Sequence, residues 1–298
     1  MHIEVLTNEW SGHRLLDSGN RRKLEQFGAV RLIRSEPKAW WRPALDDAEW
    51  RKAVAVHEDE GREGRWRFTG GKAPAEWELP LGKLRFQLRF MDNSKQIGLF
   101  PEQSPHWRWL AAQDTTAPAG GEPLRLLNLF GYTGAASLVA AAAGWHVTHV
   151  DASKPAIAWG RRNQELSGMA DAPVRWILED AVKFVQREER RGSRYDAILL
   201  DPPAFGRGPN NELWKIERDL PPLLDRCRAL LSPRARFLLL TVYTIDASSI
   251  LCRNLLEQTT RDLGGQIHTG ELALRDEAGQ RLLPLSLWGR WDAHPTTA

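Results

Sequence analysis

Residues 124–155 read LRLLNLFGYTGAASLVAAAAGWHVTHVDASKP, and this stretch decides the fold. It begins with an apolar run at 124–130, which is typical of a buried strand. A turn with two glycines follows, and residues 135–143 have the composition of a helix. A second apolar run at 146–150 precedes Pro155, which stands where the next helix begins. Strand, helix and strand in this order predict a βαβ unit with parallel strands.

The alternation continues to the end of the chain, and only the last two predicted strands have no helix between them. This pattern predicts an α/β fold with a Rossmann-like sheet of seven strands, mostly parallel, and helices on both faces. The final pair of strands predicts one antiparallel strand at or near an edge of the sheet. The remaining strands are predicted at 174–178, 195–200, 236–241, 266–274 and 282–291, and the remaining helices at 155–166, 181–191, 214–231 and 248–260.

The first third of the chain has a different pattern. Short segments of alternating polarity, separated by Gly, Pro and acidic residues, predict a small β-rich domain. These segments are residues 29–33, 65–68 and 83–90. Residues 57–65 (HEDEGREGR) are predicted to form a charged turn or loop, and the Pro- and Gly-rich stretch 117–123 (APAGGEP) is interpreted as a linker. The predicted domains are therefore residues 1–116 and 117–298.

The composition is that of a globular protein, with 42% hydrophobic and 27% charged residues and a formal net charge of +3. No apolar run reaches the ~18 residues that a membrane helix needs. Residues 1–10 also lack a signal-peptide pattern, so a cytoplasmic protein without a membrane partner is expected. Cys227 and Cys252 lie in predicted helices and are expected to be buried thiols. The histidines show no metal-ligand spacing, so no metal site is predicted.

The candidate site comprises the residues at the carboxyl ends of the strands, because ligands bind there in an open α/β sheet. The first strand ends in NLFGYTG, residues 128–134, where two glycines let the backbone approach a ligand closely. The spacing GYTGAA departs from the dinucleotide motif GxGxxG and so disfavours NAD and FAD. Asp151, after the second strand, is suited to hold both hydroxyls of a ribose or to cap the next helix. Asp180 follows the third strand, and two roles stay open for its side chain: it can bind an adenine or cap the next helix.

The fourth strand ends in the most specific motif of the chain, Asp-Pro-Pro-Ala-Phe at 201–205. Two prolines directly after a buried strand end its hydrogen-bond ladder and fix an extended backbone, whose carbonyls can point into a pocket. The ring of Phe205 offers a face on which a planar base can stack. We interpret Asp201, Pro202, Pro203 and Phe205 as the corner that holds the target group.

Together, these strand ends resemble class I S-adenosylmethionine (SAM) dependent methyltransferases. The Asp-Pro-Pro-x-Phe form further resembles the bacterial 23S ribosomal RNA methyltransferases that modify cytosine C5 or guanine N7. The resemblance includes residues 127–134, 151–153 and the lead-in KQIGLFPEQ at 95–103, and it covers roughly residues 95–260. It implies an enzyme with SAM as cofactor, RNA (above all ribosomal RNA) as substrate, and Asp201, Pro202, Pro203 and Phe205 as catalytic residues. The residues that it places around the cofactor are Gln103, Asn128, Phe130, Gly131, Tyr132, Thr133, Gly134, Asp151, Ala152, Ser153, Asp180, Ala181 and Asp201.

One departure from that family affects the mechanism. The cytosine-C5 members attack the ring with a cysteine after the fifth strand, where this chain has Leu-Thr-Val-Tyr-Thr-Ile at 240–245. Cys252 lies about two turns into the next predicted helix, and Cys227 lies in the middle of another. Covalent catalysis through cysteine is therefore not expected, and the chain is more similar to members that methylate a heteroatom. Tyr243 is a candidate for one wall of the target pocket.

The N-terminal domain carries basic and aromatic side chains of the kind that bind single-stranded RNA. Two interpretations are open: either the basic residues contact phosphates, or they form an ordinary solvated face over a core that contains most of the tryptophans. Two other functions also stay open, namely methylation of a small molecule or protein side chain, and a non-catalytic RNA-binding module on a methyltransferase scaffold. The side chains considered are Arg21, Arg22, Lys23, Arg31, Arg34, Lys38, Trp40, Trp41 and Arg42.

Overall fold

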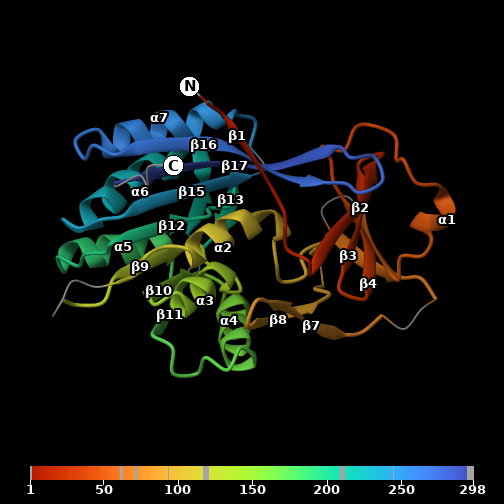
Figure 1. Ribbon diagram of the computed structural model, residues 1–298, viewed down its shortest axis with the longest axis horizontal. Helices are drawn as coiled ribbons and strands as arrows, with labels where there is room; N and C mark the ends of the chain where they lie inside the picture. Colours follow the sequence, from red (N-terminus) through yellow and green to blue (C-terminus); the bar gives the residue numbers. More distant parts are fainter. Residues whose placement is uncertain are drawn as a thin grey trace.

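The computed structural model describes residues 2–60, 63–70, 73–92, 94–116, 121–208, 212–243 and 245–293. Its larger part is an eight-stranded sheet (Figure 1). The strand order is β1 (Glu4–Thr7), β16 (Gln266–Arg275), β17 (Leu282–Asp292), β15 (Phe237–Tyr243), β12 (Ala197–Leu200), β9 (Arg125–Leu129), β10 (His146–Asp151) and β11 (Val174–Leu178). β17 is antiparallel to both of its neighbours, and the other pairs are parallel. The predicted sheet, mostly parallel with one antiparallel strand, is confirmed.

The eighth strand, β1, was not predicted, and it places residues 4–7 in the large sheet rather than in the N-terminal β-rich region. β1 pairs in parallel with β16, from Glu4 opposite Gly270 to Thr7 opposite Ala273. A Cβ at Gly270 would lie 1.8 Å from the Glu4 carbonyl oxygen, so this pairing needs the glycine. Four residues are too few to show a clear period in the sequence. The domain boundary at residue 117 stays a prediction.

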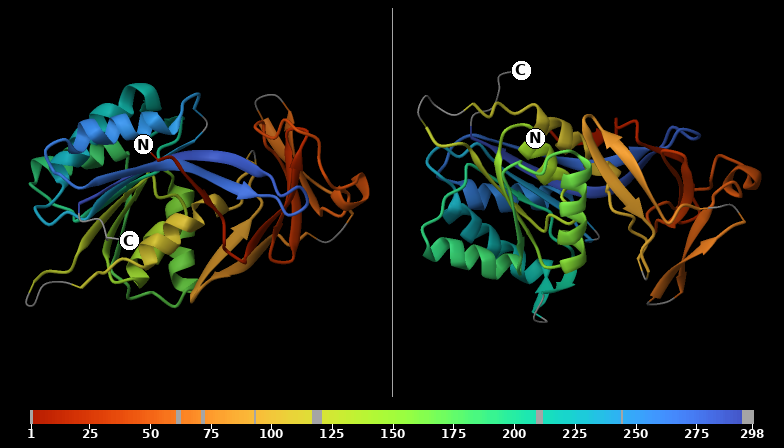
Figure 2. Two further views of the ribbon diagram at one scale, coloured as in Figure 1. Left: turned by 45° about the horizontal axis from the view of Figure 1, so that its top comes forward. Right: turned by 90° about the horizontal axis from the view of Figure 1, so that it is seen from below.

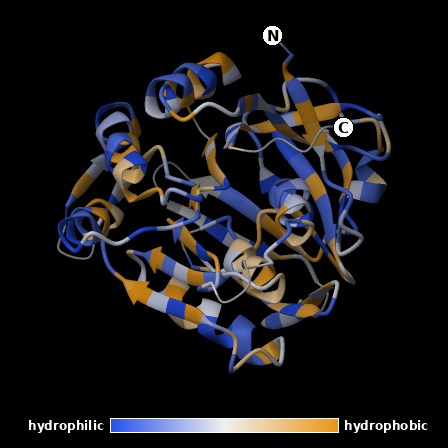
Figure 3. Cartoon of the chain, turned by 60° about the vertical axis from the view of Figure 1, so that its left-hand side comes forward, coloured by the Kyte–Doolittle hydropathy of each residue, from blue (hydrophilic) through white to orange (hydrophobic). Residues whose placement is uncertain are grey.

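Helices cover both faces of the large sheet (Figure 2). Because side chains alternate along a strand, Leu126 and Leu199 pack on one face, and Leu127 and Ile198 on the other. The helices show hydrophilic and hydrophobic residues side by side, as expected of helices with one face on a core (Figure 3). Among the described residues, no helix is long and apolar enough to cross a membrane. One face carries α2 (Ser104–Ala111), α3 (Ala135–Ala142) and α4 (Lys154–Leu166), and the other α5 (Ala181–Arg190), α6 (Ile216–Leu230) and α7 (Ser249–Thr260).

The N-terminal region is β-rich, as predicted, and its sheet has five strands. The prediction of a turn or loop at 57–65 is wrong, because β5 (Ala55–Glu60) and β6 (Glu63–Phe68) form an antiparallel hairpin there. Residues 61–62 of this hairpin lie outside the described residues. Charged side chains suit this hairpin because they pair across it, as Arg67 does with Glu58. The elements are β2 (His13–Gly19), β3 (Arg22–Phe27), β4 (Val30–Ser35), α1 (Asp47–Trp50), β5 (Ala55–Glu60) and β6 (Glu63–Phe68), followed by a separate hairpin of β7 (Glu76–Leu81) and β8 (Leu84–Arg89).

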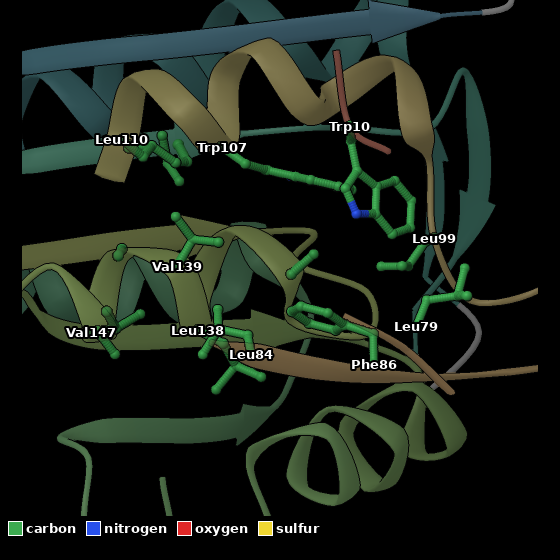
Figure 4. Close-up of a cluster of buried hydrophobic side chains, with 14 of the residues drawn as sticks. Trp10, Leu79, Leu84, Phe86, Leu99, Trp107, Leu110, Leu138, Val139 and Val147 are labelled. Carbon is green, nitrogen blue, oxygen red and sulfur yellow. The ribbon is translucent and has the colours of Figure 1, made fainter. Parts of the chain in front are cut away.

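A continuous apolar core joins the two regions (Figure 4). The rings of Trp10 and Trp107 meet edge to face with centroids 6.1 Å apart, close to α3. The β16–β17 hairpin extends from the large sheet to the N-terminal region (Figure 1). Near its turn, Arg281 donates hydrogen bonds to Asp17 at 2.9 Å and to Asp276 at 3.1 Å. Long-range apolar and charged contacts thus hold the N-terminal region against the large sheet.

Candidate active site at the strand ends

A cavity of about 370 Å³ lies at the carboxyl ends of the parallel strands. It brings together residues from the ends of five strands, β9, β10, β11, β12 and β15, which are far apart in the sequence. A smaller cavity of about 70 Å³ adjoins it on the side of α2 and shares Phe130, Tyr132 and Asp201. Of the expected site residues, the larger cavity is lined by Phe130, Tyr132, Asp151, Ala152, Ser153, Asp180, Ala181, Asp201 and Pro203, and the smaller one also by Gln103, Asn128, Gly131 and Thr133.

The loop after β9 is held in an unusual backbone conformation. Phe130 and Tyr132 have φ values of 58° and 51°, which non-glycine residues rarely adopt. Such local strain is found at ligand-binding loops when the surroundings impose it. Gly131 packs so closely on His149 that a Cβ would lie 2.4 Å from the His149 Cε1. The loop therefore presents its backbone to the cavity on a rigid support.

Asn128, expected to bind the cofactor, is buried beneath this loop. Its amide nitrogen donates to the Ser137 hydroxyl at 2.9 Å, and that hydroxyl lies 2.9 Å from Nδ1 of His149. Burial lowers the pKa of His149 to about 3, so its ring is neutral. Asn128 thus supports the loop that lines the cavity. Ser137 and His149 were not predicted as site residues, because nothing in their spacing in the sequence indicates a shared hydrogen-bond network.

Asp151 organises the rim between β9 and β10. One carboxylate oxygen accepts from the backbone N–H of Tyr132 at 2.8 Å, and the other from the N–H of Ser153 at 2.8 Å. Burial raises the pKa of Asp151, and the two N–H donors oppose that shift. Because each carboxylate oxygen has two acceptor sites, one on each oxygen stays available to a pair of hydroxyls.

Asp180 lies at the carboxyl end of the next strand and caps α5. Its side chain accepts from the backbone N–H of Lys183 at 3.0 Å. The residue also lines the cavity, so the two interpretations of Asp180 are compatible in one geometry. Ser153 likewise lines the cavity and caps a helix. Its side chain accepts from the Ala156 N–H at 3.3 Å at the start of α4.

Asp201 is the least satisfied carboxyl group of the site. Gln103 donates to its Oδ2 at 3.3 Å, whereas its Oδ1 is buried and has no hydrogen-bond partner among the described residues. Burial, together with the nearby carboxyl group of Glu102, raises the pKa of Asp201 to about 8. A buried polar atom without a partner carries a cost of about 1–3 kcal/mol, which a bound donor would remove. Asp201 therefore offers a ready contact to a ligand.

The rest of the double-proline corner differs in part from the expectation. The Pro203 carbonyl already accepts from the Trp214 indole N–H at 2.6 Å. Phe205 is 57% exposed on a small hairpin of β13 (Phe205–Arg207) and β14 (Leu213–Lys215), and it is not among the residues that line either cavity in the described chain. The same holds for Pro202 and Gly134. Trp214, which sequence analysis placed in a helix, lines the cavity instead, with its ring 5.1 Å from that of Phe130.

Tyr243 lines the cavity at the end of β15, as expected, with its ring 6.1 Å from that of Phe100. Neither cysteine lines either of the two cavities: Cys227 and Cys252 are buried free thiols in α6 and α7. The described residues contain no group of three His, Cys, Asp or Glu side chains that could hold a metal ion. The site thus combines acidic and aromatic side chains with a rigid backbone loop.

The profile of the S-adenosylmethionine-dependent methyltransferases matches residues 2–274. The chain belongs to this family. The methyltransferase is also similar in structure to a SAM-dependent methyltransferase from Agrobacterium tumefaciens, with a TM-score of 0.93 and 47% identity over 99% of this chain and 95% of that one. The cofactor of the enzyme is therefore SAM, and the predicted family and fold class are confirmed.

Two curated relatives of this methyltransferase are named for ribosomal RNA. Ribosomal RNA large subunit methyltransferase K of Neisseria meningitidis is 34% identical over 72% of this chain and 61% of its own length. Ribosomal RNA large subunit methyltransferase I of Aeromonas salmonicida is 31% identical over 52% of this chain and 38% of its own length. The chain thus spans less than two thirds of these relatives.

Proposed function

We propose that this methyltransferase transfers the methyl group of SAM to a nucleobase of RNA, with ribosomal RNA as the target class, and that it uses no cysteine nucleophile. The observation that carries the proposal is the Oδ1 of Asp201, which is buried in a cavity with aromatic walls and has no hydrogen-bond partner in the described part of the chain. Nucleobases carry amino and imino groups at the edge of a flat ring and so match both features. The names of the two relatives support the same target class. A cytoplasmic location is part of this proposal.

The residues present fit the cofactor. Asp151 would accept hydrogen bonds from the ribose hydroxyls at the acceptor sites that its two oxygens retain, and Asp180, which lines the same cavity, would accept from the adenine amino group. The backbone of the 130–134 loop would pass beside the amino acid portion. When bound, SAM supplies a methyl group on a positive sulfonium, which a correctly oriented lone pair can attack without further activation.

The remaining steps depend on the side chains of this chain. With a pKa of about 8, Asp201 is largely protonated at pH 7 and can both donate and accept a hydrogen bond at the edge of the target base. Gln103 orients the carboxyl group through its Oδ2. Phe100 and Tyr243 form an aromatic wall that would flank the base and exclude water.

A thiol mechanism is disfavoured by the placement of both cysteines. Burial raises the pKa of the Cys252 thiol to about 12 and also raises that of Cys227. The thiolate is the nucleophilic form, so such groups are inert at neutral pH. The end of β15 carries Tyr243 instead, whose pKa burial also raises. A target heteroatom with its own lone pair needs no enzyme nucleophile.

The proposal is tested by incubating the protein with methyl-labelled SAM and total RNA from a strain that lacks it. We expect label in RNA, and we expect Asp201→Ala to lower the rate about 10²–10³-fold, because alanine can neither donate nor accept a hydrogen bond at the edge of the base. SAM affinity should change little. Asp225→Ala, at an exposed position of α6, is the matched control and should keep full activity. Label in protein or small molecules but never in RNA would refute the proposed substrate.

A further inference from the structure

The smaller cavity, of about 70 Å³, is lined by a polar side chain that the proposed mechanism does not use. This side chain is His106, which lies in α2 and is 2% exposed. It follows Gln103, at the N-terminal end of α2, by three residues and precedes Leu110 by four, so the three share one face of the helix. All three line the cavity. His106 therefore lies one helical turn further along the cavity wall than Gln103, which donates to Asp201.

The ring of His106 is buried with its hydrogen-bonding capacity unused. Neither ring nitrogen has a hydrogen-bond partner among the described residues. The ring is held by packing, since it meets the indole of Trp288 edge to face with centroids 5.3 Å apart. Burial, and to a smaller extent the charge of Arg290, lowers the pKa of His106 to about 3, so the ring is neutral at pH 7. A neutral imidazole presents one N–H donor and one acceptor nitrogen, and both are costly to bury without a partner.

The cavity has room for a small polar group. Its volume is about five times what one water molecule needs. An α-amino carboxylate group, whose non-hydrogen atoms are one nitrogen, two carbons and two oxygens, fills a space of that order. Besides His106, the side chains of Asp201 and Thr241 bring polar groups to the wall. The cavity thus suits a ligand group that both donates and accepts hydrogen bonds.

The place of the cavity along the sheet identifies which part of the cofactor it suits. The strands β12, β9, β10 and β11 are neighbours in this order. Asp151 and Asp180, proposed to bind the adenosine portion, stand at the ends of β10 and β11. The smaller cavity is lined instead from β12, β15 and the loop after β9, by Leu200, Thr241 and Phe130 among others. A SAM molecule that lies across these strand ends with its adenosine at β10 and β11 has its amino acid portion at β9 and β12.

We propose that His106 binds the amino acid portion of SAM, with its ring N–H donating to the carboxylate. The inference rests on the placement of the cofactor in the proposed function and is independent of the RNA target. A hydrogen bond to a charged group is stronger than one between neutral groups, so this contact uses a buried imidazole well. His106 is then the residue that distinguishes SAM from adenosine compounds without the amino acid portion. The same contact accounts for a histidine whose ring nitrogens find no partner in the described part of the chain.

The test measures, by calorimetry without RNA, the binding of two adenosine ligands. S-adenosylhomocysteine carries the amino acid portion, and 5′-methylthioadenosine lacks the α-amino carboxylate group. His106→Phe keeps a planar ring but removes both nitrogens. We expect it to weaken the binding of S-adenosylhomocysteine about 10–100-fold, the worth of one hydrogen bond to a charged group, and to leave that of 5′-methylthioadenosine near the parent value. His146→Phe, at an exposed position at the start of β10, is the matched control and should change neither affinity.

A stability measurement separates binding from packing. His106→Phe removes two buried nitrogens to which none of the described residues bonds, so the ligand-free variant should have a urea midpoint equal to or above that of the parent. A histidine needed only for the fold would give a lower midpoint instead. His106→Gln, which keeps an N–H donor, is the second variant and should retain more affinity for S-adenosylhomocysteine than His106→Phe does.

The outcomes separate this inference from the proposed function. Parent-like affinity for S-adenosylhomocysteine in both His106 variants would overturn the inference alone. An equal loss for both ligands would assign His106 to the shape of the whole site and would also overturn it. Unchanged binding of both ligands by Asp151→Ala would overturn the placement of the cofactor, and the inference with it. Label in protein rather than RNA would refute the target class and leave this inference standing. A loss confined to S-adenosylhomocysteine, without a lower urea midpoint, would establish the contact.

Discussion

Asp201 at the active site and Glu25 in the N-terminal sheet are both buried carboxyl groups, yet their surroundings have opposite effects. Burial alone would raise the pKa of Glu25, but Arg34, Lys23 and a hydrogen bond from His13 outweigh it and hold that pKa well below its usual range. Asp201 has no such cationic partners among the described residues: burial and, after it, the nearby carboxyl group of Glu102 raise its pKa to about 8. The hydrogen bond that it accepts from Gln103 is long, at 3.3 Å.

The difference separates a structural carboxylate from one poised for a ligand. The partners of Glu25 come from the protein itself, and its charge is fully used in the fold. Asp201 keeps a buried oxygen to which none of the described residues donates, and folding alone would not favour this arrangement. Strongly perturbed carboxyl groups in a cleft mark functional sites when a specific unmet interaction accompanies them. The comparison therefore predicts large losses of stability at Glu25 and losses of activity rather than stability at Asp201.

The largest expected effect is at Glu25. Glu25→Gln removes the negative charge and leaves the buried guanidinium of Arg34 without its carboxylate partner. We expect a loss of about 3–5 kcal/mol in the free energy of unfolding, measured by urea denaturation at pH 7. Glu122→Gln, at an exposed position before β9, is the control and should leave the urea midpoint unchanged. If the Glu25→Gln protein were as stable as the parent, the charge of Glu25 would not stabilise the fold, and the contrast with Asp201 would be wrong.

These two carboxyl groups also differ in how far the sequence predicts them. Asp201 and Asp151 follow buried strands directly, so their position at the sheet edge follows from local pattern and from the topology of parallel sheets. The role of Glu25 depends on a three-stranded pairing that brings His13 and Arg34 beside it. The link between Asp17 and Arg281 spans most of the chain and has no local signal.

For the candidate site too, local sequence patterns predict only some of the residues that come together. Its strand-end residues were predictable because one rule places them together, whereas the walls from Phe100 and Trp214 depend on how separate segments pack. Phe205 was expected to stack on the target because it follows the prolines, but the β13–β14 hairpin turns it outward. Strand pairing with a segment ten residues further on overrides the local spacing that the prediction used.

The effect of intermediate size is the pH dependence that Asp201 gives to the free energy of unfolding. Its folded pKa of about 8 exceeds the unfolded value of about 3.9, so the folded state binds the extra proton between these values. The stability that this proton supplies is present below pH about 4 and is lost as pH rises through 8, by up to about 1.4 kcal/mol per pH unit. Asp201→Asn lacks this loss, so its stability relative to the parent should increase from pH 5 to pH 8.

Urea titrations of both proteins without ligand at pH 5, 6.5 and 8 measure this difference. Asp225→Asn is the matched control, since an exposed carboxylate should give a constant difference from the parent. A constant difference for Asp201→Asn as well would show that its carboxylate is already charged at pH 5. The contrast with Glu25 would then rest on hydrogen bonds rather than on protonation.

The smallest effect is expected at an exposed carboxylate, Glu277, which completes the series. Glu277 pairs with Arg14 across the junction between the β16–β17 hairpin and the N-terminal sheet, but the two side chains are 43% and 53% exposed. Water screens such a pair, and ordering two long side chains offsets most of the attraction. Glu277→Gln should therefore change the free energy of unfolding by less than about 0.5 kcal/mol, and less still in 1 M salt. A loss approaching that of Glu25→Gln would mean that charge at the junction stabilises the fold regardless of burial, and burial would then no longer distinguish the two regions.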